Sequence, residues 1–195
     1  MTTAIMLKDL EDWAKEKLCS KIKFKQPVQP NESMDGNYDY KIVNPNVFVM
    51  YIPKEDQLPD GVASVFPNLC IEWDGDRESP HSHKGEATIR LKLGVWNPGD
   101  HKGDFVNGKP DAEPDFKRNA KGYEDIINWI DLIKRELRNN ELICGKYRVK
   151  LESDILSGTP SEQRTLLDFN PYYFGYVEFS IEYESIQNKF FNELL

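Results

Sequence analysis

The sequence predicts a single α+β domain in which an antiparallel sheet is covered on one face by helices and connected by long loops. Several segments alternate between apolar and polar residues, as strands do, and they are grouped around one strong amphipathic helix at residues 123–137. No fixed-period repeat or low-complexity tract divides the chain. We therefore treat residues 1–195 as one domain.

The first helix is expected at residues 6–18, with Thr3 as a candidate N-cap. Its apolar residues recur at spacings of three and four: Leu7, Leu10, Ala14 and Leu18. The helix at 123–137 follows Gly122 and has acidic residues near its start and basic residues near its end, as the helix dipole favours. Its expected apolar stripe consists of Tyr123, Ile126, Ile127, Ile130, Ile133 and Leu137.

Strands are expected at residues 47–51, 66–73, 87–95, 146–151 and 172–183. The first is apolar on both faces and predicts an inner strand, and the second ends at the polar residues 74–76. In 87–95 the odd-numbered residues are apolar, whereas Arg90 and Lys92 point to a face that is solvated or covered by a neighbouring subunit. In 146–151, Tyr147, Val149 and Leu151 share one side.

Loops account for much of the remaining chain. Residues 26–46 are rich in Pro, Asn, Asp and Gly, with a partly formed strand near 38–43, and 152–165 is a polar loop. Residues 97–121 contain almost no periodic apolar residues, and a stretch of this length without a helix or strand is too long for an ordinary connection. We expect the loop at 97–121 to contact a partner. Residues 184–195 predict a short amphipathic helix, with Ile186, Phe190, Phe191 and Leu194 as its apolar residues.

The composition fits a folded chain that does not bind nucleic acid by sequence. Aromatic residues number 10 Phe, 9 Tyr and 4 Trp, enough to fill a core. The 33 acidic residues outnumber the 25 basic ones, for a net charge of −8, whereas nucleic-acid-binding proteins usually present a basic face. No apolar run has the length of a membrane-spanning helix, and the first residues lack a secretory apolar stretch. We expect a soluble protein without a membrane partner.

The three cysteines, Cys19, Cys70 and Cys144, lie far apart and next to aliphatic residues. This placement predicts reduced, buried thiols that act as small apolar groups, and it fits an intracellular protein. A catalytic pair of cysteine and histidine remains open on composition alone.

His81 and His83 form a His-x-His pair that could hold a divalent ion. Nearby residues with suitable side chains are Asp74, Asp76, Glu78 and His101. The stretch is nevertheless hydrophilic and bounded by Pro80 and Gly85, which predicts a solvated hairpin loop instead. No nucleophile elbow, HExxH, P-loop or GxGxxG motif is present. We therefore assign no catalytic, cofactor-binding or metal-binding residues and expect no enzyme and no cofactor.

Four segments, in their order along the chain, resemble the tail terminator (tail completion) proteins of tailed bacteriophages and phage-tail-like bacteriocins, in the form found in prophages of Gram-positive bacteria. These segments are FPNLCIEWDGD at 66–76, ATIRLKLGVWNPG at 87–99, KGYEDIINWIDLIKREL at 121–137 and PYYFGYVEFSIEY at 171–183.

The resemblance implies a structural protein of a virion or phage-tail-like particle, assembled in the host cytoplasm. Such a protein forms a hexameric ring on the last ring of the tail tube protein and ends tail growth. The resemblance also implies that the ring offers a docking surface to a neck, collar or head-connector protein, or to the sheath protein of a contractile tail. The aromatic residues at 172–176 and the loop at 97–121 are the candidate contacts.

Three alternatives remain open at this stage. The first is another neck or adaptor protein of the same particle. The second is a small metal-dependent hydrolase that uses His81 and His83 with nearby carboxylates. The third is an unrelated domain that binds a small ligand, which would need a pocket that the sequence does not show.

Overall fold

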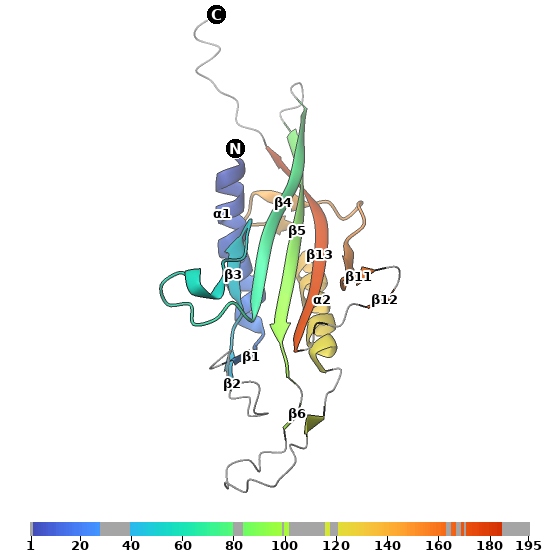
Figure 1. Ribbon diagram of the computed structural model, residues 1–195. Helices are drawn as coiled ribbons and strands as arrows, with labels where there is room; N and C mark the ends of the chain where they lie inside the picture. Colours follow the sequence, from blue (N-terminus) through green and yellow to red (C-terminus); the bar gives the residue numbers. More distant parts are fainter. Residues whose placement is uncertain are drawn as a thin grey trace, which may run out of the picture.

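A seven-stranded sheet forms the centre of the molecule (Figure 1). The computed structural model describes residues 2–27, 40–79, 84–98, 100–101, 116–117, 121–162, 165–166, 169 and 171–184. Along the sheet the strands are β3 (Asn46–Val49), β4 (Asn68–Ser79), β5 (Lys84–Trp96), β13 (Tyr172–Glu184), β9 (Tyr147–Val149) and β8 (Leu142–Ile143), and β10 (Leu156–Gly158) also pairs with β13. All pairs are antiparallel except β3 with β4. The α+β class is confirmed.

Two helices cover one face of this sheet, behind the strands in Figure 1. Helix α1 (Thr3–Trp13) is continued by a π-helical turn (Ala14–Leu18) and a short 3-10 turn (Cys19–Lys21). Its N-cap is Thr2 and not the predicted Thr3, because the Thr2 hydroxyl accepts a hydrogen bond from the backbone N–H of Ile5 at 3.4 Å.

Helix α2 (Lys121–Asn139) lies over β13 and β5. The prediction for its apolar stripe is wrong at Ile127, whose exposed fraction is 53%, and it missed Trp129, which is fully buried. At about 100° per residue, the buried Trp129, Ile130, Ile133 and Leu137 all lie within about 60° of Ile126 around the helix, whereas Ile127 lies about 100° from Ile126 and falls outside this arc. The helix uses Ile126, and Trp129 lies on the same side.

The alternation predicted for the two longest strands is confirmed. The side chains that pack beneath the helices are Ala87, Ile89, Leu91, Leu93 and Val95 of β5, together with Tyr173, Val177, Phe179, Ile181 and Tyr183 of β13. At Gly175 the helix approaches β13 so closely that a Cβ atom there would lie 2.6 Å from Cγ2 of Ile126. The sheet and helices thus form one core, and the other face of β5 and β13 points away from both helices.

Strand β4 continues beyond its predicted end at 74–76 and reaches Ser79. The register shifts between Trp73 and Gly75. Gly75 has a φ of 130°, a backbone conformation that residues other than glycine rarely adopt. This bulge lets the charged residues that follow remain paired with β5. The end of the hairpin, residues 80–83, lies outside the described part of the chain.

Two other strand predictions need correction. Strand β3 lies at the edge of the sheet and not inside it, since β4 is the one strand with which it pairs in the described part of the chain, and it also contacts α1 and the π turn. Strand β9 ends at Val149, so the prediction that Leu151 shares a side of this strand with Tyr147 and Val149 is wrong: Leu151 lies beyond the strand and is exposed.

The predicted loops contain short strands. Strand β1 (Phe24–Pro27) pairs with β2 (Tyr40–Val43), close to the strand expected near 38–43. Strand β6 (Asp100–His101) pairs with β7 (Phe116–Lys117), and β11 (Ser161–Glu162) pairs with β12 (Thr165–Leu166). The expectations of no element over 97–121 and of a plain loop over 152–165 are therefore wrong in part. A helix was expected at 184–195. Glu184 instead belongs to β13, and the remaining residues, 185–195, lie outside the described part of the chain.

A carboxylate of α1 anchors the turn between β8 and β9. Oδ2 of Asp9 accepts hydrogen bonds from Nζ of Lys146 at 2.8 Å and from the hydroxyl of Tyr147 at 2.7 Å. These bonds, with the one from Lys146 as the larger cause, hold the pKa of Asp9 below its ordinary value of 3.8. A lowered pKa contributes stability above the unfolded value, and this contribution is lost as the pH falls through the folded value.

Replacing Asp9 by asparagine is therefore expected to weaken the acid dependence of stability. Urea unfolding from neutral pH down to about pH 2 should show the wild type losing more of its free energy of unfolding below about pH 4 than the variant loses. Asp12→Asn, on an exposed part of the same helix, is the matched control and should follow the wild type. An Asp9→Asn curve parallel to the wild type would contradict the assignment.

Candidate functional site

The outward side of β5 and β13, which we call the open face, carries the best candidate site. Here the register places Glu72 of β4, Arg90 of β5 and Glu178 of β13 in one row across the sheet. The guanidinium of Arg90 donates to Oε2 of Glu178 at 2.6 and 2.9 Å and lies 2.9 Å from Oδ2 of Asp74. Nζ of Lys92 donates to Oε1 of Glu72 at 2.6 Å. The charges of this face are thus largely neutralised within the chain.

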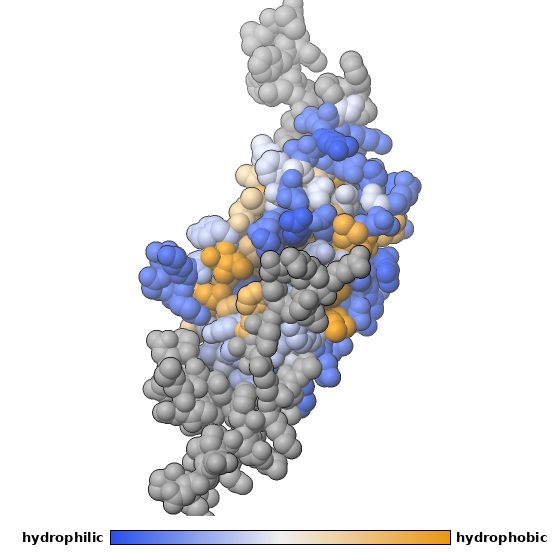
Figure 2. Space-filling model, turned by 45° about the vertical axis from the view of Figure 1, so that its right-hand side comes forward, coloured by the Kyte–Doolittle hydropathy of each residue, from blue (hydrophilic) through white to orange (hydrophobic). Residues whose placement is uncertain are grey.

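A groove of about 740 Å³ lies on the open face beside these ion pairs. Ile52 and Leu156 contribute to its apolar lining, and Phe174 and Tyr176 of β13 line it as well. Leu156 is 51% exposed, and Ile52 follows the exposed Met50 and Tyr51. Figure 2 shows that exposed hydrophobic residues form separate patches on a mostly hydrophilic surface.

Aromatic rings lie close together next to the groove. The ring of Phe66 lies 4.8 Å from that of Tyr172 and 5.9 Å from that of Phe174, between centroids, and Phe169 also contacts Phe174. Phe66 fits over β5 because Gly94 has no side chain: a Cβ there would lie 2.9 Å from the Phe66 ring. Partly exposed aromatic rings beside an apolar groove are typical of a protein-contact surface.

The aromatic residues at 172–176, which we predicted as a contact with other subunits, lie on both faces of the sheet. Tyr173 packs in the core, whereas Phe174 and Tyr176 point to the groove. Arg90 and Lys92 lie on the open face, opposite the core-facing residues of β5, as the alternation predicted. Sequence reasoning missed Ile52 and Leu156, because isolated apolar residues in polar loops carry no periodic signal.

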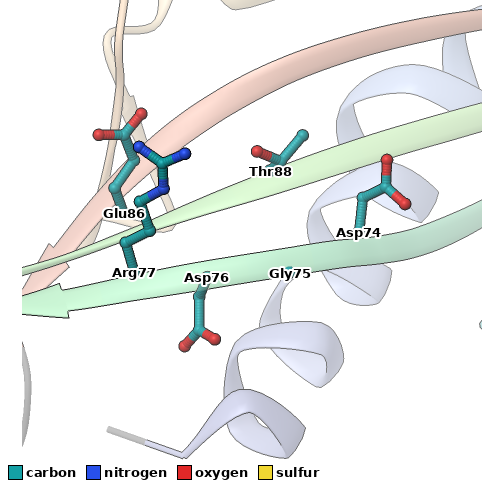
Figure 3. Close-up of a pocket in the computed structure, with 6 residues that line it drawn as sticks. All are labelled: Asp74, Gly75, Asp76, Arg77, Glu86 and Thr88. Atoms are coloured by element: carbon teal, nitrogen blue, oxygen red, sulfur yellow. The ribbon is translucent and has the colours of Figure 1, made fainter.

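A second, smaller hollow of about 380 Å³ lies along the β4–β5 hairpin and contains two of the carboxylates near the histidine pair. In Figure 3, Asp74 and Glu86 point to one side of the hairpin and Asp76 to the other. There Oδ2 of Asp76 accepts a hydrogen bond from the hydroxyl of Tyr183 at 2.7 Å. Two of the carboxylates of the metal hypothesis, Asp74 and Asp76, therefore point to opposite sides of the hairpin.

The histidines themselves lie mostly beyond what the structure describes. His81 and His83 fall in 80–83, and for His101 only the backbone pairing with Phe116 is described. Within the described ranges, no group of three or more His, Cys, Asp or Glu side chains could hold a metal ion.

The cysteines show no sign of activation. Cys19 and Cys70 are buried as predicted, and burial raises the pKa of their thiols to about 12 and about 11. Cys144 is exposed, so the prediction of a buried thiol is wrong there. It occupies the β8–β9 turn with a φ of 53°, followed by Gly145 at 66°, and its thiol donates to the backbone carbonyl of Asp9 at 3.3 Å. Partial burial raises the pKa of Cys144 as well.

Comparison with known proteins identifies no family: no protein-family model matches the chain, and no curated protein matches it. Among the helices that the structure describes, none combines the length and the apolar character needed to cross a membrane. The functional conclusion therefore depends on the fold, the open face and the resemblance of the sequence segments.

Proposed function

We propose that this protein is a structural subunit that forms a hexameric ring on the end of a tail tube, in a phage or a phage-tail-like particle. The ring ends tail growth and offers a docking surface to a neck, collar or head-connector protein, or to a sheath protein. The observation that carries this proposal is the open face, with its apolar groove and internally paired charges.

The open face suits a protein contact better than permanent exposure to water. A solvated sheet face is normally polar along its whole length. This one instead has the rings of Phe174 and Tyr176 in a groove that Ile52 and Leu156 also line. Burying such a groove against a partner releases water from apolar surface, which is the main driving force of association.

The two faces of the sheet also suit a ring. Subunits in a closed ring contact each other through two different surfaces, one on each side of the subunit. The open face and the outer side of α2 lie on opposite sides of the same sheet. A contact between unlike surfaces repeats from subunit to subunit in one direction, as ring closure requires.

Light scattering on the purified protein over a range of concentrations, with and without isolated tail tubes, tests the proposal. We expect a particle of about six times 22.7 kDa, either free or on the ends of tubes. Leu156→Asp places a charge in the groove and should reduce assembly at least tenfold, because an unpaired charge is costly to bury.

The matched control is Leu142→Asp, because Leu142 on β8 is 52% exposed, about as much as Leu156, and does not line the groove. It should assemble as the wild type does. A protein that stays monomeric at every concentration and ignores tail tubes would refute the proposal. Loss of stability on addition of a chelator would instead favour the metal site at His81 and His83.

A further inference from the structure

The outer side of α2, which is turned away from the sheet, carries one exposed apolar residue and several charges. The exposed residues of this side include Glu124, Ile127, Asn128, Asp131, Arg135 and Arg138. Arg135 and Arg138 make no ion pair with any other residue that the structure describes. An isoleucine followed by two such guanidinium groups suits a contact with a surface that is apolar at one end and acidic at the other.

The open face offers such a surface. Its groove, which Tyr176 lines, is followed along the strands by the hollow of the β4–β5 hairpin, which Asp74 and Thr88 line. Figure 3 shows that the side chains of Asp74 and Thr88 point to the same side of the hairpin. Asp74 and Glu178 share the guanidinium of Arg90, so neither has a cation of its own among the described residues. A further arginine would therefore gain a carboxylate partner here.

The apolar and charged ends follow each other in the same direction on both sides of the subunit. A Cβ at Gly122 of α2 would lie against the ring of Tyr173, and a Cβ at Gly175 would lie against Ile126. The residue numbers thus increase together along α2 and β13, so the helix and the strand run in the same direction.

The spacing of the two ends also agrees. Ile127 and Tyr176 directly follow the contact between α2 and β13, so they lie at about the same level along the strands. Arg135 comes eight residues after Ile127, which is about 12 Å along a helix. Ser180, the pairing partner of Thr88, comes four residues after Tyr176, which is about 13 Å along a strand. The basic end of α2 is therefore level with the hollow of the hairpin.

We propose that the outer side of α2 in one subunit packs on the open face of the next subunit, a contact that rests on the proposed ring. Subunits of a closed ring are related by rotation about one axis, so each residue keeps its level along that axis in every subunit. With the strands directed along the axis, Ile127 enters the neighbouring groove beside Tyr176. Arg135 and Arg138 then reach the carboxylates around Asp74. Each subunit supplies both sides, so the contact repeats until the ring closes.

Thiol cross-linking of the full chain tests the contact. In a Cys144→Ser background, which removes the exposed thiol, one chain carries both Ile127→Cys and Tyr176→Cys. Within a chain these positions have the helix and the sheet between them, so a short bismaleimide cannot join them in a monomer. Where light scattering shows assembly, with tail tubes added if assembly needs them, we expect a ladder of up to six linked chains on a denaturing gel. Leu142→Cys in place of Tyr176→Cys is the control and should give no ladder.

The outcomes separate the contact from the ring. A hexamer without cross-links refutes this contact but not the ring. A ladder that stops at two chains refutes the contact as a repeating one, because it indicates a closed pair. A ladder that ends at another number supports the contact and refutes the hexamer, and a chain that stays monomeric refutes both.

An exchange of charge across the contact is a second measurement. Arg138→Glu alone and Thr88→Lys alone should each raise the concentration needed for assembly about tenfold, because each brings like charges together. The double variant should need no more protein than either single variant, whereas independent losses would multiply to about 100-fold. The two positions lie on opposite sides of the sheet in one chain, so their coupling would arise between subunits. Losses that multiply would contradict the contact.

Discussion

Replacing Trp129 by alanine is expected to lower the free energy of unfolding by about 3–5 kcal/mol, the range found for large aromatic residues removed from a core. Trp129 lies on α2 with none of its surface exposed, and its ring centroid is 4.9 Å from that of Phe24 on β1. The change would leave a cavity between the helix, β1 and the sheet. Urea unfolding at equal m-value measures the loss.

Two variants calibrate this result. Trp129→Phe should cost less, because it keeps most of the ring, and the indole N–H finds no hydrogen-bond partner among the described residues. Ile127→Ala, on the exposed side of the same helix, should change the free energy of unfolding by less than about 1 kcal/mol. If Trp129→Ala were as stable as Ile127→Ala, the packing of α2 described above would be wrong.

Gly175→Val is expected to destabilise the protein by about 2–3 kcal/mol, because the core has no room for a side chain at this position. A Cβ at Gly175 would lie 2.6 Å from Cγ2 of Ile126 and 3.3 Å from Cδ1 of Ile130, both on α2. Since these atoms belong to a buried part of the helix, relief requires α2 to move away from β13. Thermal or urea unfolding would show the loss.

The control for Gly175→Val is Ser180→Val, which places the same side chain on the opposite face of the same strand. Ser180 is only partly buried, and valine suits a strand, so this variant should keep the stability of the wild type within about 0.5 kcal/mol. Equal losses in the two variants would contradict the close approach of α2 at Gly175.

The core variants and the groove variants should separate stability from assembly. Trp129→Ala removes packing beneath the sheet and should lower stability, whereas Leu156→Asp changes an exposed residue and should lower assembly with little effect on unfolding. This contrast follows from the architecture, in which α1 and α2 support one face of the sheet and leave the other available. A groove variant that unfolded the monomer would point to a structural role for Leu156 instead.

Local burial could be predicted from the sequence. The alternation over 87–95 and 172–183 corresponds to β5 and β13, and the apolar spacing over 123–137 corresponds to α2, with each boundary within about three residues. These elements are long and have one buried face, so burial leaves a regular period in the chain. The single domain and the tail terminator function remain predictions of the sequence.

The tertiary structure decided the features that depend on partners distant in the chain. Residues 74–79 have no apolar period, yet they extend β4 because β5 supplies a complete pairing partner beyond the bulge at Gly75. Ile52 and Leu156 belong to separate loops, and only the folded sheet places both around one groove. A sequence pattern records which side of its own element a residue buries, whereas a groove is defined by the distance between elements, which no local pattern contains.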